Sequence, residues 1–270
     1  MIKFAQDENI SDLERSLIQN EGYFEAILKS RLRLPHFKES MYVWIIYDMD
    51  GAPCGAIDVM GNEMMISLSG SDRIDFGEIA NFIMFRLPKG KILCDRKVGI
   101  QILNYLDHYG IDYSEESGNI MHYQSNCPPS TKSSGYNFVD EPSVEGIYRA
   151  MCRFFPEYEQ KIPFDAFYTT TIYKRNHDQA FFTAIEDRGV YIGIGGCFSM
   201  GYKTAVISDI VVADDYRRRG IASQMIGILT EKSLERRCKP LLSSATFISD
   251  SLYLKHGYDF AGQWINIDLE

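Results

Sequence analysis

Long hydrophobic runs and metal-binding cysteine patterns are both missing from this sequence. No apolar stretch among the 270 residues reaches the ~20 residues that a membrane-spanning helix needs, so we expect no membrane segment. The first eight residues contain no basic segment followed by an apolar one, which predicts that no signal peptide is present. The six cysteines are scattered without a Cys-x-x-Cys pair, and the five histidines are dispersed. These absences argue against a zinc site and a disulfide framework and favour the reducing cytoplasm.

An excess of positive charge is missing as well. Lys and Arg number 28 against 37 Asp and Glu, and the net charge of −9 argues against general binding of nucleic acid. The sign reverses in residues 214–239, which contain seven basic and four acidic residues. A basic segment in an acidic protein fits a polyanionic ligand, although Arg236 and Arg237 are typical of the solvated face of a helix. No Gly-x-x-x-x-Gly-Lys-Ser/Thr loop occurs to favour a nucleotide.

The residues that precede this basic segment are typical of a strand. Residues 206–212 are mostly apolar and rich in β-branched side chains, and two acids, three arginines and Gly220 follow. The amphipathic run 223–234 then predicts a helix. In such a strand–loop–helix unit, the backbone amides of the turn and the N-terminus of the helix point the same way and form an anion site. The sequence therefore predicts a phosphate-bearing ligand at this turn.

Arg217, Gly220 and Ala222 give the spacing Arg-x-x-Gly-x-Ala. This spacing resembles the acyl-CoA pyrophosphate loop of the GNAT superfamily, the Gcn5-related N-acetyltransferases. A second segment, Leu-Tyr-Leu-Lys-His-Gly-Tyr at 252–258, is similar to the family's Leu-Tyr-x-x-x-Gly-Phe pattern. The resemblance covers residues 140–270, with the two motifs in the family's order.

The resemblance implies an α/β fold with a GNAT-like mixed central sheet flanked by helices, acetyl-CoA as cosubstrate, and no metal. Backbone N–H groups of the loop would hold the pyrophosphate, and the strand before the loop would separate from its neighbour to receive the pantetheine arm. The side chains of that strand are expected to pack into the core. The residues implied to bind the cosubstrate are Ile210, Val211, Val212, Arg217, Arg218, Arg219, Gly220, Ile221, Ala222, Ser223 and Thr246.

Catalysis is implied at two positions. The resemblance places Tyr253 where a phenol protonates the departing CoA thiolate. Many family members have a Glu at the position of Ser208, so the base is less well defined. Because neighbouring side chains of a strand point to opposite faces, we expect Ser208 and Asp209 to diverge, and we favour Asp209 as the contact to a proton-relay water. A structural Asp209 and a non-catalytic, half-buried Tyr253 are the alternatives. Thr246 stands where the family often has Asn.

Pro, Ser and Gly cluster at 125–135, near the middle of the chain. We predict a first domain at 1–130, a linker at 131–142 and a second domain at 143–270.

The two halves resemble each other. A predicted hairpin of strands 42–47 and 54–60 in the first half corresponds to strands 180–185 and 190–199 in the second. A matching strand and tyrosine-containing helix follow in both halves. We therefore predict an internal duplication that gives two tandem related α/β domains.

The remaining elements of the second half follow from periodicity. Ser143, after Pro142, is expected to cap the first helix. The order of two helices, a sheet and a βαβ crossover agrees with the GNAT fold. Helices are predicted at 143–154, 164–174, 221–238 and 249–256, and further strands at 204–212, 240–246 and 258–267.

The counterpart of the phosphate loop in the first half is acidic. Residues 69–78 contain Asp72, Asp75 and Glu78 where the second half has arginines. Carboxylates stabilise a helix N-terminus but would repel a pyrophosphate. We expect the first half to have lost CoA binding and to serve as a wall of the acceptor site or as a packing partner.

The sequence thus predicts a cytoplasmic N-acetyltransferase that transfers an acetyl group from acetyl-CoA to a primary amine by direct attack in a ternary complex. The acceptor is a small molecule or a peptide, and no nucleic-acid or membrane partner is expected. Residues 154–173 and the first half are the expected sources of acceptor contacts. Two alternatives remain: a sensor or scaffold that binds acyl-CoA without turnover, and a site for another phosphate ligand.

Overall fold

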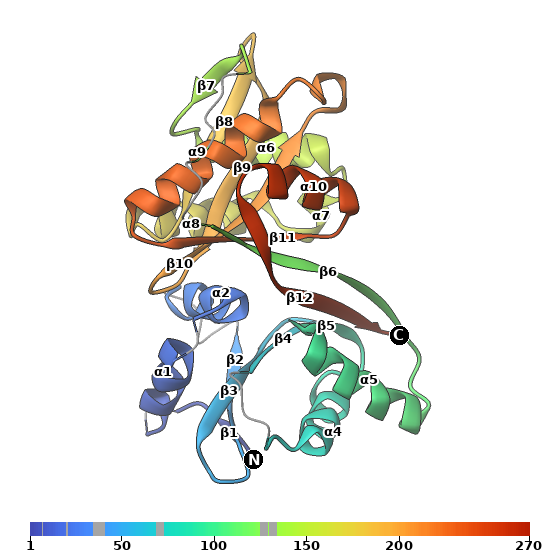
Figure 1. Ribbon diagram of the computed structural model, residues 1–270. Coiled ribbons are helices and arrows are strands. Elements are labelled where there is room, and N and C mark those ends of the chain that lie inside the picture. Colours follow the sequence, from blue (N-terminus) through green and yellow to red (C-terminus); the bar gives the residue numbers. More distant parts are fainter. Residues whose placement is uncertain (7, 20, 35–40, 69–72, 125–128, 130–133) are drawn as a thin grey trace. The chain divides into compact units, whose positions relative to one another are not determined.

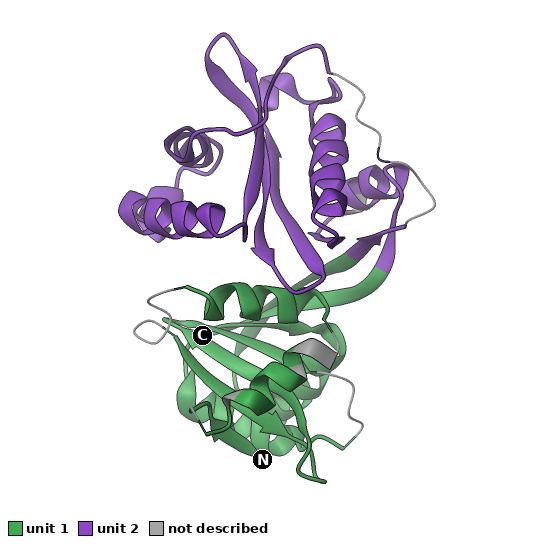
Figure 2. Ribbon diagram, turned by 90° about the vertical axis from the view of Figure 1, so that its left-hand side faces the viewer, with its two compact units in different colours: residues 1–120, 261–270 green, residues 121–260 purple. Residues whose placement is uncertain are grey.

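The computed structural model describes residues 1–270 apart from positions 7, 20, 35–40, 69–72, 125–128 and 130–133. The chain divides into two compact units (Figure 2): residues 1–120 with 261–270 form the first unit, and residues 121–260 form the second. This division differs from the predicted linker at 131–142. Part of that segment, Asn137–Val139, is a strand, and the last ten residues return to the first unit.

The first unit contains both helices and strands (Figure 1). Its helices are α1 (Ile10–Gln19), α2 (Tyr23–Leu32), α4 (Phe76–Arg86) and α5 (Arg96–Tyr109). Its strands are β1 (Ile2–Phe4), β2 (Tyr42–Tyr47), β3 (Pro53–Met60), β4 (Glu63–Leu68) and β5 (Gly90–Asp95). Two further strands, β6 (Tyr113–Tyr123) and β12 (Tyr258–Leu269), have residues in both units.

The sheet of the first unit has the strand order β1-β2-β3-β4-β5-β12. Strands β4 and β5 pair in parallel, and the other pairs are antiparallel. Alternate side chains of β4 enter two hydrophobic clusters: Met64 and Ile66 pack with residues of α4 and α5, whereas Met65 packs with residues of α1 and α2. Helices therefore cover both faces of this sheet.

After the end of β6, the second unit continues with strand β7 (Asn137–Val139). Its helices are α6 (Val144–Phe154), α7 (Tyr158–Lys161), α8 (Phe164–Asn176), α9 (Ile221–Glu235) and α10 (Phe247–Lys255), with a short 3₁₀ turn η1 (Asp214–Tyr216). Its other strands are β8 (Phe181–Asp187), β9 (Val190–Met200), β10 (Thr204–Val212) and β11 (Lys239–Ser244).

The sheet of the second unit repeats the arrangement of the first. Its order is β11-β10-β9-β8-β7, with β10 parallel to β11 and the other pairs antiparallel. Phe182 and Ile194 pack with α6 and α8 on one face, and Ile207 and Leu242 pack with α9 on the other. The run β9-β10-β11 thus matches β3-β4-β5 in strand direction. The predicted class, two related α/β domains with mixed sheets flanked by helices, is confirmed.

Local signals in the sequence explain several element boundaries. Helix α6 begins after Ser143, whose hydroxyl accepts the N–H of Gly146 at 3.1 Å, as predicted for an N-cap. Helix α9 ends earlier than expected, because Arg237 takes a left-handed backbone conformation with φ 57°. Helix α10 begins at Phe247 rather than at 249, because Thr246 is the residue that caps it.

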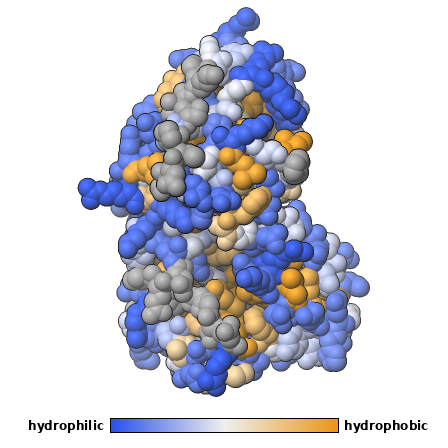
Figure 3. Space-filling model, in the orientation of Figure 1, coloured by the Kyte–Doolittle hydropathy of each residue, from blue (hydrophilic) through white to orange (hydrophobic). Residues whose placement is uncertain are grey.

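The surface is mainly hydrophilic on the face shown in Figure 3, with hydrophobic residues in scattered patches. Isolated exposed apolar side chains, such as Phe85 and Ile248, are normal for a folded protein. Within the described ranges, no helix is both long enough and apolar enough to cross a membrane.

Candidate active site in the second unit

The second half of β10 pairs with a strand on one side only. Parallel pairing with β11 runs from Thr204 opposite Lys239 to Ile207 opposite Leu242, where it ends. Beyond this point β10 continues to Val212 beside β9. Backbone N–H and C=O groups on the β11 side of this stretch are available to a ligand, because among the described residues no strand pairs with them. The separation of the two strands is the one implied by the sequence.

Asp209 lies in a bulge of β10. The register with β9 shifts between Ser208 and Val211, so that β10 contains one residue more than β9 at this point. Asp209 has a φ of 55°, in the left-handed region that Asp tolerates better than most residues. The Ser208 hydroxyl donates to Asp209 Oδ2 at 3.2 Å. The expectation that these two side chains diverge is therefore wrong, because the bulge interrupts the alternation of the strand.

The carboxyl group of Asp209 is accessible to solvent but crowded by protein atoms. Loss of solvation raises its pKa, and the hydrogen bond from Ser208 opposes that shift. A carboxyl group with a raised pKa in an accessible position is typical of a proton acceptor.

Tyr158 on α7 is the neighbour of Asp209 that the sequence did not single out. Burial raises the pKa of the Tyr158 hydroxyl, and the negative charge of Asp209 raises it further. The Tyr158 ring lies 5.9 Å from the ring of Tyr148 and 6.2 Å from that of Phe167, measured between centroids. The segment 154–173 had been expected to supply acceptor contacts, but its many aromatic residues gave no reason to prefer Tyr158.

The loop after β10 leads into a helix without a side-chain cap. Gly220, the residue before α9, has a φ of 82°, and among the described residues no side chain caps the first turn of the helix. A Cβ added at Gly220 would meet no atom within 4 Å, so glycine is favoured here by backbone conformation and not by space. Arg218 is also left-handed, with φ 63°. The N–H groups of the first turn and the helix dipole together form an anion site.

The three arginines of this loop have different roles. Arg217 forms an ion pair with Asp214 at 2.6 Å. Arg219 donates to the Tyr136 hydroxyl and to the carbonyl of residue 215, both at 2.8 Å. Arg218 forms no ion pair within the part of the chain that the structure describes. Arg217 and Arg219 therefore hold the loop, and Arg218 is the arginine available to a bound anion.

Most of the other residues that were implied to bind the cosubstrate have only main-chain groups available to a ligand. Ile210 and Val212 pack beside the Ile221 cluster and Val211 packs on the opposite face, so these side chains belong to the core, as expected. Ile221 is 1% exposed, which leaves only its main chain for a ligand. The next two residues of α9 are half-buried: Ala222 and Ser223.

Tyr253 lies in the last turn of α10 and is half-buried. Its ring centroid is 6.2 Å from that of Tyr258. Burial and the nearby Asp250 raise the pKa of Tyr253 to about 12, so the phenol keeps its proton at neutral pH. Thr246 caps the same helix by accepting an N–H of the first turn at 3.2 Å. Within the described residues Tyr253 and Asp209 form no hydrogen bond with each other. The charged neighbour of Tyr253 is Asp250, and the neighbour of Asp209 is Tyr158.

Thiol chemistry and metal binding find no support in the described residues. Five cysteines are free, and Cys127 lies outside the described residues. Burial raises the pKa of the Cys197 thiol to about 12, which makes it a poor nucleophile. The described residues contain no group of three or more His, Cys, Asp or Glu side chains that could hold a metal ion.

Comparisons with known proteins identify a family model and solved structures of similar fold. A family model for the acetyltransferase (GNAT) family matches residues 144–258, and no curated protein matches the chain. A GCN5-related N-acetyltransferase from Sphaerobacter thermophilus is similar with a TM-score of 0.67 at 13% identity, over 100% of this chain and 95% of the other. A tandem GNAT protein from the clavulanic acid biosynthesis pathway has a TM-score of 0.67 at 12% identity, over 99% and 97%. An acetyltransferase from the GNAT family of Colwellia psychrerythraea has a TM-score of 0.56 at 12% identity, over all of both chains.

Sequence identities this low show a shared fold only. The matches to solved structures nevertheless extend over both units, and the family model covers most of the second. Residues 144–258 therefore form a domain of the GNAT acetyltransferase family, in a chain with the fold of the tandem GNAT proteins.

Proposed function

We propose that the second unit transfers an acetyl group from acetyl-CoA to a primary amine, by direct attack in a ternary complex. The observation that carries the proposal is the separation of β10 from β11 after Ile207, followed directly by the uncapped N-terminus of α9. These features offer backbone groups to an amide-rich arm and N–H donors to its phosphates in one continuous stretch. Acetyl-CoA, when bound, supplies the activated acetyl group.

Within this proposal the loop recognises phosphate mainly through main chain. The N–H groups of Ile221, Ala222 and Ser223 point out of the first turn of α9, and Gly220 lets the anion approach. Arg218 adds a positive charge, while Arg217 and Arg219 keep the loop in shape.

Two residues carry out proton transfer in this proposal, one as proton acceptor and the other as proton donor. Asp209, whose pKa is raised but whose carboxyl reaches solvent, takes the proton of the acceptor amine directly or through water. Tyr253, protonated at neutral pH, gives a proton to the leaving thiolate. We assign the polarisation of the thioester carbonyl to a backbone N–H of the β10 bulge.

The corresponding helix of the first unit is closed to an anion. Asp75 caps α4 by accepting the N–H of Glu78 at 3.0 Å, and Glu78 accepts the N–H of Ile2 at 2.8 Å. The register of β4 with β3 also has no shift, so this strand has no counterpart of the bulge. These carboxylates support a single acetyl-CoA site per chain, although residues 69–72 of this loop lie outside the described residues.

The residues around Asp209 indicate the chemical class of the acetyl acceptor. A carboxylate beside aromatic rings, Asp209 beside Tyr158 and its neighbours, fits a cationic amine that must lose a proton before it attacks. The free thiols of the described cysteines agree with a reducing compartment, and we place the reaction in the cytoplasm.

Calorimetric titration with acetyl-CoA tests the proposal. We expect the unaltered protein to bind acetyl-CoA with micromolar affinity. The double variant Arg218→Glu/Gly220→Asp should bind about tenfold or more weakly, because both substitutions place negative charge at the phosphates. Lys89→Glu, an exposed substitution in the first unit that reverses one positive charge as Arg218→Glu does, should bind normally. Absence of binding by the unaltered protein would overturn the proposed cosubstrate.

A second function, acyl-CoA binding without turnover, is favoured by one observation. Ser208 stands where many relatives would have a carboxylate, and its hydroxyl is engaged with Asp209. A screen of primary amines with detection of released thiol separates the two functions. Thiol release that depends on an amine supports the enzyme, and binding without release for every amine supports a sensor or scaffold.

A further inference from the structure

The second unit has a pocket that none of the proposed acetyl-transfer residues lines. Its volume is about 520 Å³, within the range of small-molecule sites. It is lined by residues from β6, from the C-terminal end of α9 and from the start of β11. Because β10 and β11 are parallel, the start of β11 lies at the opposite end of the sheet from the loop that follows β10. The pocket is therefore separate from the proposed acetyl-CoA site.

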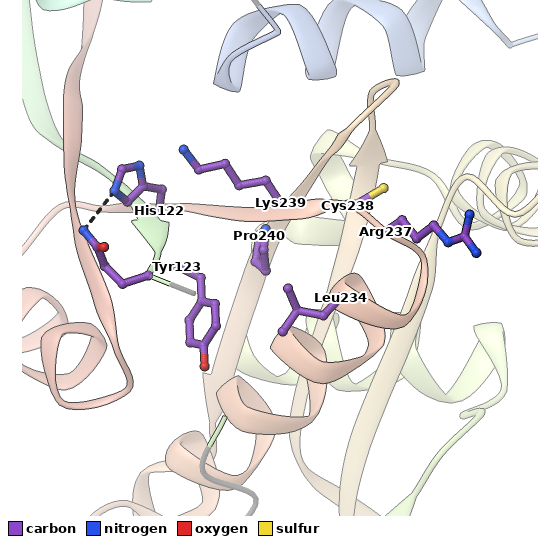
Figure 4. Close-up of a pocket in the computed structure, with 8 residues that line it drawn as sticks. His122, Tyr123, Leu234, Arg237, Cys238, Lys239 and Pro240 are labelled. Atoms are coloured by element: carbon purple, nitrogen blue, oxygen red, sulfur yellow. Dashed lines mark hydrogen bonds between the residues drawn. The ribbon is translucent and has the colours of Figure 1, made fainter. Parts of the chain in front are cut away.

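One part of the lining is apolar. Leu234 at the end of α9 is 42% exposed although it is a large aliphatic side chain. Pro240 and the ring of Tyr123 lie close to it in the pocket (Figure 4). An apolar wall of this kind favours a ligand that has a hydrocarbon or aromatic body.

The other part of the lining is cationic. In Figure 4 the side chain of Lys239 extends toward the side of the pocket where His122 lies, whereas the guanidinium of Arg237 points away. Lys239 is exposed and forms no ion pair within the described residues. Its charge acts on His122, since burial and then the nearby Lys239 lower the pKa of that imidazole. An anion bound between the Lys239 ammonium and the His122 imidazolium would stabilise both cations, which otherwise repel each other.

A glutamine orients the histidine, and one acid is nearby. Gln124 Nε2 lies 3.4 Å from His122 Nε2 and donates to Asp259 Oδ2 at 3.1 Å. Asp259 raises the pKa of His122, against the larger effects of burial and Lys239. The Asp259 carboxylate accepts from Gln124 and forms no ion pair with Lys239 among the described residues.

We propose that this pocket binds a small organic carboxylate, with the carboxylate between Lys239 and His122 and the apolar body against Leu234, Pro240 and Tyr123. The carboxylate accepts charge-assisted hydrogen bonds from the ammonium and, at lower pH, from the imidazolium. Affinity should therefore rise as pH falls, because the bound anion favours the protonated histidine.

Benzoate, its neutral isostere benzamide and inorganic phosphate test the three parts of this proposal by calorimetry. We expect benzoate to bind at millimolar concentration or better, several-fold more tightly at about pH 6 than at about pH 8. Benzamide should bind at least about tenfold more weakly, because it lacks the charge. Phosphate should also bind more weakly, because it lacks the apolar body.

Two variants locate the site. Lys239→Gln should weaken benzoate about tenfold, and His122→Phe should remove the pH dependence while leaving some affinity. Lys89→Gln is the matched control on the first unit and should change nothing. Acetyl-CoA binding should be normal in both pocket variants, which also shows that they fold.

Four results overturn the proposal. Equal affinities for benzoate and benzamide would show that the pocket does not recognise the carboxylate. Equal affinities for benzoate and phosphate would show that it does not recognise the organic body. A benzoate affinity unchanged in Lys239→Gln would show that benzoate binds elsewhere. Absence of benzoate binding at millimolar concentration at both pH values also counts against it.

Discussion

At the scale of single residues, two tyrosines five positions apart have different environments. Tyr253 is half-buried on α10, whereas Tyr258 is 2% exposed and its hydroxyl lies 2.7 Å from Thr230 Oγ1. Only the first is accessible enough to exchange a proton with a substrate. The sequence named Tyr253 from its motif, and the structure gives the physical reason to prefer it over its neighbour.

Replacing Tyr253 by Phe should lower kcat by about a hundredfold, because the general acid is removed, with little effect on the KM for acetyl-CoA. Steady-state kinetics with a primary amine measure both constants. Tyr258→Phe is the control: it should lower the free energy of unfolding by about 1 kcal/mol through loss of a buried hydrogen bond and leave kcat near the unaltered value. Equal kcat values for Tyr253→Phe and the unaltered protein would show that the tyrosine is structural.

Asp209 should control the acidic limb of the pH–rate profile. Loss of solvation by the surrounding protein atoms raises its pKa, and the ionised form is needed as base, so kcat/KM falls as pH decreases through that pKa. Ser208→Ala removes the hydrogen bond that lowers this pKa, and the limb should move to higher pH. Comparing both proteins with one acceptor cancels the titration of the amine itself. An unmoved limb would assign the base elsewhere.

At the scale of elements, the two helix caps of the second unit allow a matched comparison. Ser143 caps α6 and Thr246 caps α10, each by accepting an N–H from the first turn. Ser143→Ala and Thr246→Ala should each lower the free energy of unfolding by about 1 kcal/mol in chemical denaturation. Only Thr246→Ala should also raise the KM for acetyl-CoA. If both variants leave that KM unchanged, Thr246 is a cap and not a ligand contact.

Periodicity and cap residues predicted most elements of the second unit but not the bulge at Asp209. The apolar pattern of residues 206–212 predicts a regularly paired strand, and no residue type in it indicates an extra residue in the register with β9. The bulge arises from pairing with β9, a tertiary feature. The same limit applies to Tyr158, whose proximity to Asp209 depends on how α7 packs. Local sequence thus located the loop and the helix but not the acid–base geometry.

At the scale of the whole molecule, each unit has its own core. The clusters around Ile66 and Leu28 contain only first-unit residues, and those around Ile207, Ile194 and Ile192 contain only second-unit residues. Independent cores predict that damage to one unit leaves the packing of the other intact.

The buried ion pair of the first unit tests this independence. Arg31 bonds to Asp58, whose side chain is fully buried, so Arg31→Met leaves an uncompensated carboxylate and should cost about 3–5 kcal/mol in the first unit. Hydrogen exchange should accelerate in β3 and β4 but not in β9 and β10. Equal acceleration in both units would show that the chain unfolds as one cooperative block.

The predicted domain boundary failed to anticipate that the second unit is an insertion. A linker rich in Pro, Ser and Gly suggests two contiguous domains, but residues 261–270 pair back onto the first unit through β12. A strand's partner is set by its exposed edge and by its side-chain pattern together, and only the pattern is visible locally.

Because β12 belongs partly to the first unit, the sheet of that unit cannot be completed until the end of the chain has been synthesised. Residues Trp264–Leu269 pair with Asp95–Gly90, so β5 lacks this neighbour until more than 160 further residues have been synthesised. During that interval the edge of β5 is open to pairing with other chains, a known route to aggregation. We therefore expect the yield of the first unit, which is encoded almost entirely in the first half of the message, to depend on translation speed through the second half and on chaperones that mask strand edges.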